Sequence, residues 1–421
     1  MLDFLINDFL GTPAILIGLF ALAGLLLQKK KNAADTVSGT LKTAMGFVIL
    51  SAGAAIVSNS LAVFGSMFEK AFHIKGVVPN TDAISAIAQK TFGTETALIM
   101  IFGMIVNILL ARLTPFKYIF LTGHHILYMA SLISAVLITG GISGVPLIAA
   151  GAIILGGLMV LSPAILQPYT KKISGSDDLA LGHFGSAGYF IAGFIGKHAG
   201  NPSHSTEDIK VPKSLGFLRD TSVSISLTMA LLFFIVAPFA GKDFIESSLS
   251  GGSHFLVYSF MQAITFAAGV YVILAGVRMV IAEIVPAFKG IAEKLVKGAK
   301  PALDCPTVFP FAPNAVIIGF LSSFLAGIVS IFLLPVFGLS VIVPGLVPHF
   351  FTGAAAGVYG NATGGVRGAV LGAFANGILI SFLPALLLPV LGSLGFEGTT
   401  YGDSDFGIIG ILLGWIIQFF N

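Results

Sequence analysis

Long apolar runs, separated by short polar or basic stretches, make up most of this chain. A helix needs about 20 mostly apolar residues to cross the hydrocarbon core of a bilayer, and most of the runs approach that length. The pattern predicts an all-α polytopic membrane protein with about eleven transmembrane helices. The runs cover about 13–28, 43–64, 95–113, 118–140, 145–166, 221–240, 255–284, 314–337, 339–360, 366–392 and 405–420.

Three stretches, one of them among these runs, are too irregular for a simple transmembrane helix. Residues 66–93 are polar and hold only a short helix-like piece, while 179–196 are punctuated by glycines. Residues 339–360 contain Pro344 and Pro348. Irregular backbone at membrane depth is tolerated only where protein or a water-filled cavity receives its polar groups. We therefore expect re-entrant segments or broken hairpins here.

The composition supports a membrane protein and excludes several function classes. The 421 residues are 56% hydrophobic and 10% charged, whereas soluble domains have about 25% charged residues. The net charge of +3 is too small to indicate nucleic-acid binding. The single cysteine, Cys305, excludes an intramolecular disulfide framework and is expected to be a small buried residue. We find no nucleotide-binding motif and expect no cofactor and no metal site, so the chain carries no energy source of its own.

An eight-residue sequence motif, which we call the phrase, occurs twice. Lys75–Asp82 and Lys297–Asp304 both read Lys-Gly-x-x-Pro-x-x-Asp, 222 positions apart (304 − 82). The phrases predict two inverted repeats of five spans each, at 1–220 and 221–400, followed by an eleventh span at 401–421. The second phrase would then enter the membrane from the opposite side, and we expect the two aspartates to approach each other near the midplane.

Basic residues set the predicted orientation. Lysines and arginines gather at 29–31, 171–172, 197–219 and 289–300, which we place on the cytoplasmic side. This arrangement puts the N-terminus outside and the C-terminus inside. Asp403 and Asp405 then fall in an external segment. Because Asp3 and Asp8 precede the first apolar run, we expect no cleaved signal.

The aspartates that end the two phrases are the strongest candidates for a functional role. An ionisable residue at membrane depth costs free energy and is therefore retained mainly where it has a function. Asp304 could bind substrate hydroxyls and act as a general base toward one of them. The alternative is a carboxylate that caps the N-terminus of a broken helix. Asp82 has the same two interpretations, and Thr81 beside it is a hydroxyl donor or a cap.

Histidines supply the remaining candidates. His124 and His125 lie within the span 118–140 on adjacent helical faces, so we expect only one of them to face a central site, and we favour His124. Tyr128 is four residues further on, and hence on the same face as His124. His183 lies between glycine and phenylalanine in the broken hairpin, and His349 follows Pro348. For each histidine the alternative is a buried ring that meets a backbone carbonyl.

Several stretches together resemble a known family. They are GTLKTAMGFVILSAG (39–53), LTGHHI (121–126), LGHFGS (181–186), GVRMVIAEIVPAFKGI (276–291), KGAKPALDCPTVFPFAPNAVIIGF (297–320) and VPGLVPHFFTGAAAGVYGNATGGVRGA (343–369). With them the sequence resembles the membrane component, enzyme IIC, of the ascorbate-specific bacterial phosphotransferase system, in the ascorbate–galactitol superfamily. The resemblance extends over nearly the whole chain.

The resemblance implies a homodimer in the bacterial inner membrane. Each protomer would have a V-shaped dimerisation domain, from about 10–65 and 220–290, and a substrate-binding core domain formed by the remainder. The core would move by an elevator mechanism. Soluble enzymes IIA and IIB would relay phosphate from phosphoenolpyruvate, and enzyme IIB would phosphorylate the bound substrate, so no catalysis is expected from this chain alone.

Residue by residue, the resemblance supports His124, His183 and Asp304, and Thr81 more weakly. This chain departs from the family pattern at Tyr128-Met129 and Phe184-Gly185, where glutamines are expected, and at Asp82, where an aromatic residue is expected. L-ascorbate is the preferred substrate, with another sugar acid or a galactitol-like polyol as the alternative. An ion-coupled secondary carrier that uses Asp82 and Asp304, or a membrane receptor, would be a different class of protein.

Overall fold

The computed structural model describes residues 13–28, 32–73, 76–209, 221–391 and 399–420. The chain is mostly helical, with short two- to four-residue strands between the helices. The elements are α1 (Pro13–Leu26), α2 (Ala33–Phe72), β1 (Val78–Pro79), α3 (Thr81–Leu113), β2 (Tyr118–Phe120), α4 (Gly123–Thr139), α5 (Gly144–Ser174), β3 (Ala180–Leu181), α6 (Ser186–Ala199), η2 (Thr206–Asp208), α7 (Thr221–Ala240), α8 (Lys242–Phe244), η4 (Ile245–Leu249), α9 (Phe255–Lys294), β4 (Lys300–Leu303), η5 (Cys305–Phe311), α10 (Pro313–Val336), α11 (Leu346–Leu391), β5 (Thr399–Thr400) and α12 (Ser404–Phe420).

The length and apolarity of the helices confirm a polytopic membrane protein. Within the described ranges, six helices are long and apolar enough to cross a bilayer: α2, Thr91–Leu113 of α3, α5, Phe255–Ile284 of α9, α10 and α11. A bent pair, Ile225–Ala240 with Lys242–Leu249, would make a seventh. The helices α4 and α12 are apolar but shorter. The number of eleven transmembrane helices stays a prediction.

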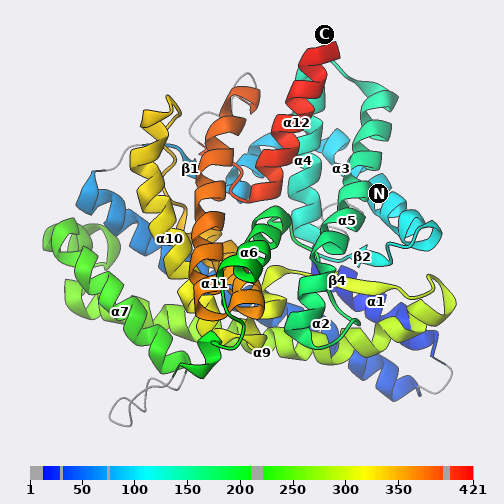
Figure 1. The fold of residues 1–421 in the computed structure, drawn as a ribbon, viewed down its shortest axis with the longest axis horizontal. Coiled ribbons are helices and arrows are strands. Elements are labelled where there is room, and N and C mark those ends of the chain that lie inside the picture. The colour runs from blue at the N-terminus through cyan, green and yellow to red at the C-terminus, as the bar shows by residue number, and fades with distance from the viewer. Residues whose placement is uncertain (1–12, 29–31, 74–75, 210–220, 392–398, 421) are drawn as a thin grey trace.

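The helices form two groups (Figure 1). In the lower part of the view α1, α2, α7 and α9 lie together, and α2 and α9 cross beneath the upright α4, α5, α11 and α12. Glycines allow α2 and α9 to approach closely, because a Cβ atom on Gly53 would lie 2.6 Å from the backbone nitrogen of Ile273. We call these groups the lower layer (α1, α2, α7, α9) and the upper layer (α3–α6, α10–α12).

Two predicted helix boundaries are wrong. The run 118–140 is not one helix, because β2 comes first and α4 begins only at Gly123. His124 and His125 therefore lie in the first turn of α4 and not in the middle of a span. In the second half, the run 339–360 begins with irregular backbone and α11 begins only at Leu346, while the break at Gly365 lies between the predicted runs 339–360 and 366–392. There φ is +59°, and a Cβ atom would collide with the carbonyls of Asn201 and His204.

Both copies of the repeated phrase form a parallel strand. The second copy contains β4, the central strand of a three-stranded sheet in the order β2-β4-β3. The first copy contains β1, which pairs with β5, while Val77 beside it bridges to Ile342. Strands that run parallel end at the same edge of a sheet. The residues that follow β2, β3 and β4 therefore lie close together at one edge of the sheet.

Candidate functional site

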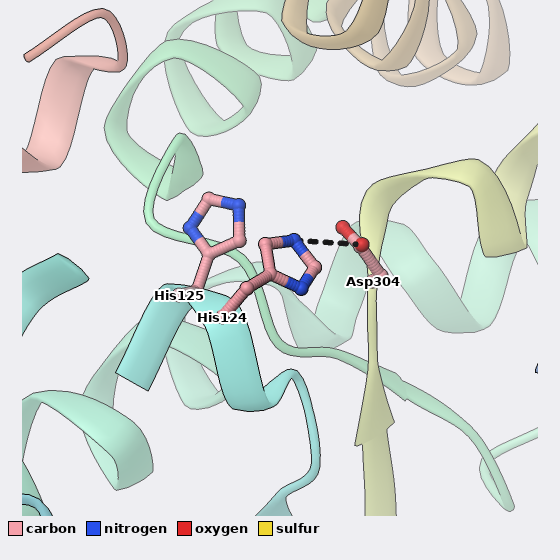
Figure 2. A group of neighbouring side chains, drawn as sticks. All are labelled: His124, His125 and Asp304. Carbon is pink, nitrogen blue, oxygen red and sulfur yellow. Dashed lines mark ion pairs between the residues drawn. The ribbon is translucent and has the colours of Figure 1, made fainter. Parts of the chain in front are cut away.

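Three of the predicted residues follow the ends of the three parallel strands. Phe120 pairs with Ala302 and Leu181 with Leu303, so His124, His183 and Asp304 leave the sheet at one edge. Nε2 of His124 lies 3.3 Å from Oδ2 of Asp304, and Nε2 of His183 lies 3.8 Å from Oδ1. Figure 2 shows the His124 ring pointing at the Asp304 carboxylate.

Asp304 combines the two roles that the sequence left open. Its Oδ1 accepts a hydrogen bond from the backbone N–H of Cys305 at 2.6 Å, so it caps the 3₁₀ helix η5. The second oxygen, Oδ2, faces His124. One carboxylate thus holds the local backbone and still presents an acceptor to the site. Cys305 is buried, as expected.

His125 also faces this site, although only His124 was expected to do so. The His125 ring is buried and lies 3.8 Å from the His183 ring, measured between centroids. In Figure 2 the two α4 histidines stand side by side on the same turn. The prediction that one of them points away was wrong, because the first turn of α4 points both side chains toward the ends of the strands.

Backbone N–H groups fix the tautomers of His125 and His183. Phe184 N–H donates to Nδ1 of His125 at 3.4 Å, and Gly185 N–H donates to Nδ1 of His183 at 3.0 Å. A ring nitrogen that accepts a hydrogen bond carries no proton, so the proton of each neutral ring is on Nε2. His183 is thereby assigned as a donor toward Asp304.

The tautomers also bear on metal binding. Three groups of residues in the described part have ligand atoms within 4.8 Å of one another: His124/His125/Asp304, His125/His183/Asp403 and His183/Asp304/Cys305. These are donor types that suit zinc. In His125 and His183, however, Nδ1 already accepts from a backbone N–H, and a metal on Nε2 would force the ring proton to face that donor. The arrangement suits hydrogen bonding better than metal ligation.

The other predicted residues are more dispersed. The Tyr128 ring lies 5.7 Å from the His124 ring, on the same side of α4. Thr81 Oγ1 accepts from Gly402 N–H at 3.0 Å, at the start of α3. His349 is hydrogen-bonded to Ser323 of α10 at 2.9 Å, and its role in binding stays a prediction. The side chain of Asp82 lies outside the described residues, so the approach of the two aspartates is untested.

The sequence interpretation missed Asp403 and Asp405, which it placed in an external segment. Both are buried, with 9% and 7% of their surface exposed. Asp403 belongs to the second of the three clusters above, with His125 and His183. A signal was available in the sequence, because Gly402-Asp403 stands near the start of the last helix much as Gly182-His183 stands near α6.

A cavity meets the site between the two layers of helices. Thr122 and Asp304 line it from the sheet side, together with Leu303. Phe47 and Leu50 of α2 and Val280 of α9 form the other wall. The cavity is small, about 10 Å³, which is room for about one water molecule, so a group bound at Asp304 would touch both layers.

An ion pair lies at the opposite end of the central strand. Lys300, the first residue of β4, places its Nζ 2.7 Å from Oδ1 of Asp177, which also accepts from Gln167. Asp177 follows α5 in a loop, outside the spanning segment. The hydrogen bond from Lys300 lowers the pKa of the Asp177 carboxyl, and Gln167 contributes in the same direction.

Residues 8–405 match the family described as PTS system sugar-specific permease component, EIIC-GAT. The chain belongs to the EIIC-GAT family. The family resemblance drawn from the sequence motifs is thereby confirmed, and the chain is a membrane-embedded member of this sugar-specific permease family.

A curated EIIC relative is the "Ascorbate-specific PTS system EIIC component" of Mycoplasma pneumoniae (strain ATCC 29342 / M129 / Subtype 1). It is 30% identical over 413 residues, which cover 85% of this chain and 62% of the relative. This EIIC-GAT chain thus spans less than two thirds of the relative's length.

Proposed function

We propose that this chain binds L-ascorbate and carries it inward for phosphorylation by enzyme IIB, which receives phosphate through enzyme IIA. The observation that carries the proposal is the meeting of His124, His183 and Asp304 at the ends of three parallel strands, beside a cavity between the two layers. The ascorbate-specific description of the Mycoplasma relative supports this substrate.

The chemistry of the site suits a small hydroxylated ring. Asp304 accepts hydrogen bonds from hydroxyls, while Nε2–H of His183 donates to carbonyl or ring oxygens. His124 and Tyr128 add polar contacts at the rim, and Thr81, Asp82 and His349 complete the predicted binding set. Asp304 is also a candidate general base that withdraws the proton from the hydroxyl that enzyme IIB phosphorylates.

The two layers support an elevator mechanism in a homodimer. The lower layer corresponds to the proposed V domain, about 10–65 and 220–290, and the upper layer to the core. Large apolar side chains such as Leu231, Phe239 and Tyr271 are more than half exposed on α7 and α9, as expected for a surface that meets lipid or a second copy. The site lies where the layers meet, so a sliding core would carry the substrate.

The repeat and the orientation belong to the same proposal. The first phrase pairs with two segments of the second half, Ile342 and β5. The second phrase pairs with two segments of the first half, β2 and β3. This correspondence supports two inverted repeats, at 1–220 and 221–400. We further propose the bacterial inner membrane, with the N-terminus outside and the C-terminus in the cytoplasm.

A second candidate substrate is a galactitol-like polyol. Phe184, at a position where glutamine was expected, is fully buried and stacks on Phe120 at 5.0 Å, so it offers no hydrogen bond to a lactone. Carboxylates near the histidines favour neutral hydroxyls over an anion.

Separate binding titrations with two ligands test the proposal. The purified full chain in detergent is titrated with L-ascorbate and, separately, with galactitol. We expect the wild type to bind L-ascorbate and Asp304→Asn to lose at least about tenfold in affinity, because one charged hydrogen bond is removed. Exposed Asp178→Asn serves as the matched control. Preference for galactitol would select the alternative, and unchanged affinity in Asp304→Asn would reduce Asp304 to a helix cap.

A further inference from the structure

The segment Tyr401–Asp405, which we call the 401–405 segment, is fixed at its N-terminal side by the first phrase. It follows β5, which pairs with β1. Gly402 N–H donates to Thr81 Oγ1 at 3.0 Å, and the Tyr401 hydroxyl lies 2.8 Å from the hydroxyl of Ser131 on α4. The segment is therefore tied to α3 and α4 before it reaches Asp403.

Its C-terminal side is fixed by the helix that follows His183. The Asp405 carboxylate accepts from the backbone N–H groups of Ser186 and Ala187, at 3.0 and 2.9 Å, and so caps α6. Asp405 N–H in turn donates to the carbonyl of Phe184 at 3.0 Å. The neighbours on both sides of Asp403 are therefore anchored by contacts of their own.

Asp403 thus reaches the histidine pair from a segment 99 positions after Asp304 (403 − 304). One carboxylate oxygen and one ring nitrogen each of His125 and His183 lie within 4.8 Å of one another. Asp304 contacts the same pair, since it lies 3.8 Å from Nε2 of His183 and in a cluster with His125. Two carboxylates therefore share the His125–His183 pair.

The two halves of the chain supply an independent argument. In the sheet of the second phrase, β3 pairs beside β4 and is followed by Gly182-His183 and then by α6. In the sheet of the first phrase, β5 pairs beside β1 and is followed by Gly402-Asp403 and then by α12. Asp403 occupies the place that corresponds to His183.

We propose that Asp403 is a second substrate-binding carboxylate and determines which hydroxylated substrate the site prefers. The inference rests on the proposed function and deepens it. Ionised carboxylates only accept hydrogen bonds, so Asp304 and Asp403 together bind a molecule that presents hydroxyls on two sides. Removing the charge of Asp403 should therefore change the balance between an anion such as L-ascorbate and a neutral polyol.

The test compares the affinities of two probes. Galactitol is neutral, and L-ascorbate is an anion at pH 7, so Asp403→Asn should affect them differently. We expect galactitol affinity to fall about tenfold, because a charged acceptor is lost. We expect L-ascorbate affinity to fall less, because repulsion is relieved as well. The ratio of the two dissociation constants should therefore shift, with the melting temperature nearly unchanged.

Asp178→Asn is the control, since it removes an exposed carboxylate that belongs to none of the histidine clusters. We expect an unchanged ratio. An unchanged ratio in Asp403→Asn would overturn the inference, as would an equal loss for both probes with a lower melting temperature. If Asp403→Asn does not fold, Asp403→Ser is titrated instead. Failure of both variants to fold would assign Asp403 to stability and overturn the inference.

The two proposals fail separately. If the wild type binds either probe and Asp304→Asn weakens it, while Asp403→Asn does not change the ratio, only the inference is wrong. If the wild type binds neither probe, the proposed function is wrong and the inference fails with it.

Discussion

At the scale of single residues, the site depends on histidines whose hydrogen-bond partners fix which ring nitrogen carries the proton. Gly185 N–H and the hydroxyl of Tyr189 both lie 3.0 Å from Nδ1 of His183. His183 is therefore held in place and presents a donor to Asp304. His124, by contrast, has 35% of its side chain exposed. The two histidines should respond differently to the same substitution.

We expect His183→Gln to lower both stability and affinity. The change leaves the buried partners of Nδ1 poorly satisfied, which costs roughly 1–3 kcal/mol of unfolding free energy. His124→Gln should weaken ligand binding and leave the melting temperature within about 2 °C, because its side chain is partly hydrated. Thermal unfolding in detergent and titration with L-ascorbate measure the two effects. Equal stability loss in both variants would contradict the distinction.

Asp304 and Asp403 show what sequence reasoning could and could not find. Asp304 stood out because its phrase occurs twice and lies between apolar spans. Asp403 did not, because a carboxylate near the end of the chain resembles a solvated loop residue until strand pairing brings β5 to β1. His125 was missed for a related reason, since helical spacing alone cannot show that α4 begins at Gly123.

At the scale of elements, the short parallel strands organise the site. The sequence indicated broken segments at 66–93 and 179–196, and the structure contains strands and interrupted helices there. The sequence could not indicate which strands pair, because the paired residues are about 120 or 180 positions apart, as Phe120 and Ala302 are. The strands satisfy backbone groups that would be costly to leave unpaired inside a bilayer.

The ion pair at the start of β4 predicts a pH dependence. Because the folded-state pKa of Asp177 is lowered, its contribution is complete above its unfolded pKa of about 3.9 and is lost as pH falls through the lower folded value. Asp177→Asn should therefore reduce stability at pH 6, by at most about 1 kcal/mol because Asp177 is half exposed. The difference between variant and wild type should disappear near pH 2. A difference that persists there would rule out the ion pair as its cause.

Two glycine substitutions, one at the contact between α2 and α9 and one on α5, should have opposite effects. A Cβ atom on Gly53 would lie 2.6 Å from the Ile273 backbone, so Gly53→Ala should destabilise the protein by about 1–3 kcal/mol. A Cβ atom on Gly157 of α5 would have no neighbour within 4 Å, so Gly157→Ala should be neutral or stabilise the helix by up to about 1 kcal/mol. Melting temperatures compare them, and similar values would show that the contact is not tight.

At the scale of the whole molecule, two layers of helices meet at the cavity beside Asp304. The apolar runs were sufficient to predict a polytopic membrane protein, and the motifs were sufficient to identify the EIIC-GAT family. The division into layers was available only through the resemblance, because hydropathy does not say which helices pack together. The elevator motion and the dimer remain proposals that this division supports.

Reconstitution in liposomes tests the central claim most directly, namely that this chain transports L-ascorbate for phosphorylation by a soluble partner. Radiolabelled L-ascorbate is supplied outside, with phosphorylated enzyme IIB either present or absent inside. We predict phosphorylated ascorbate inside only when enzyme IIB is present, and a strong reduction of this product in Asp304→Asn. Accumulation of free, unmodified ascorbate along a proton gradient by the chain alone would contradict the account and indicate an ion-coupled carrier.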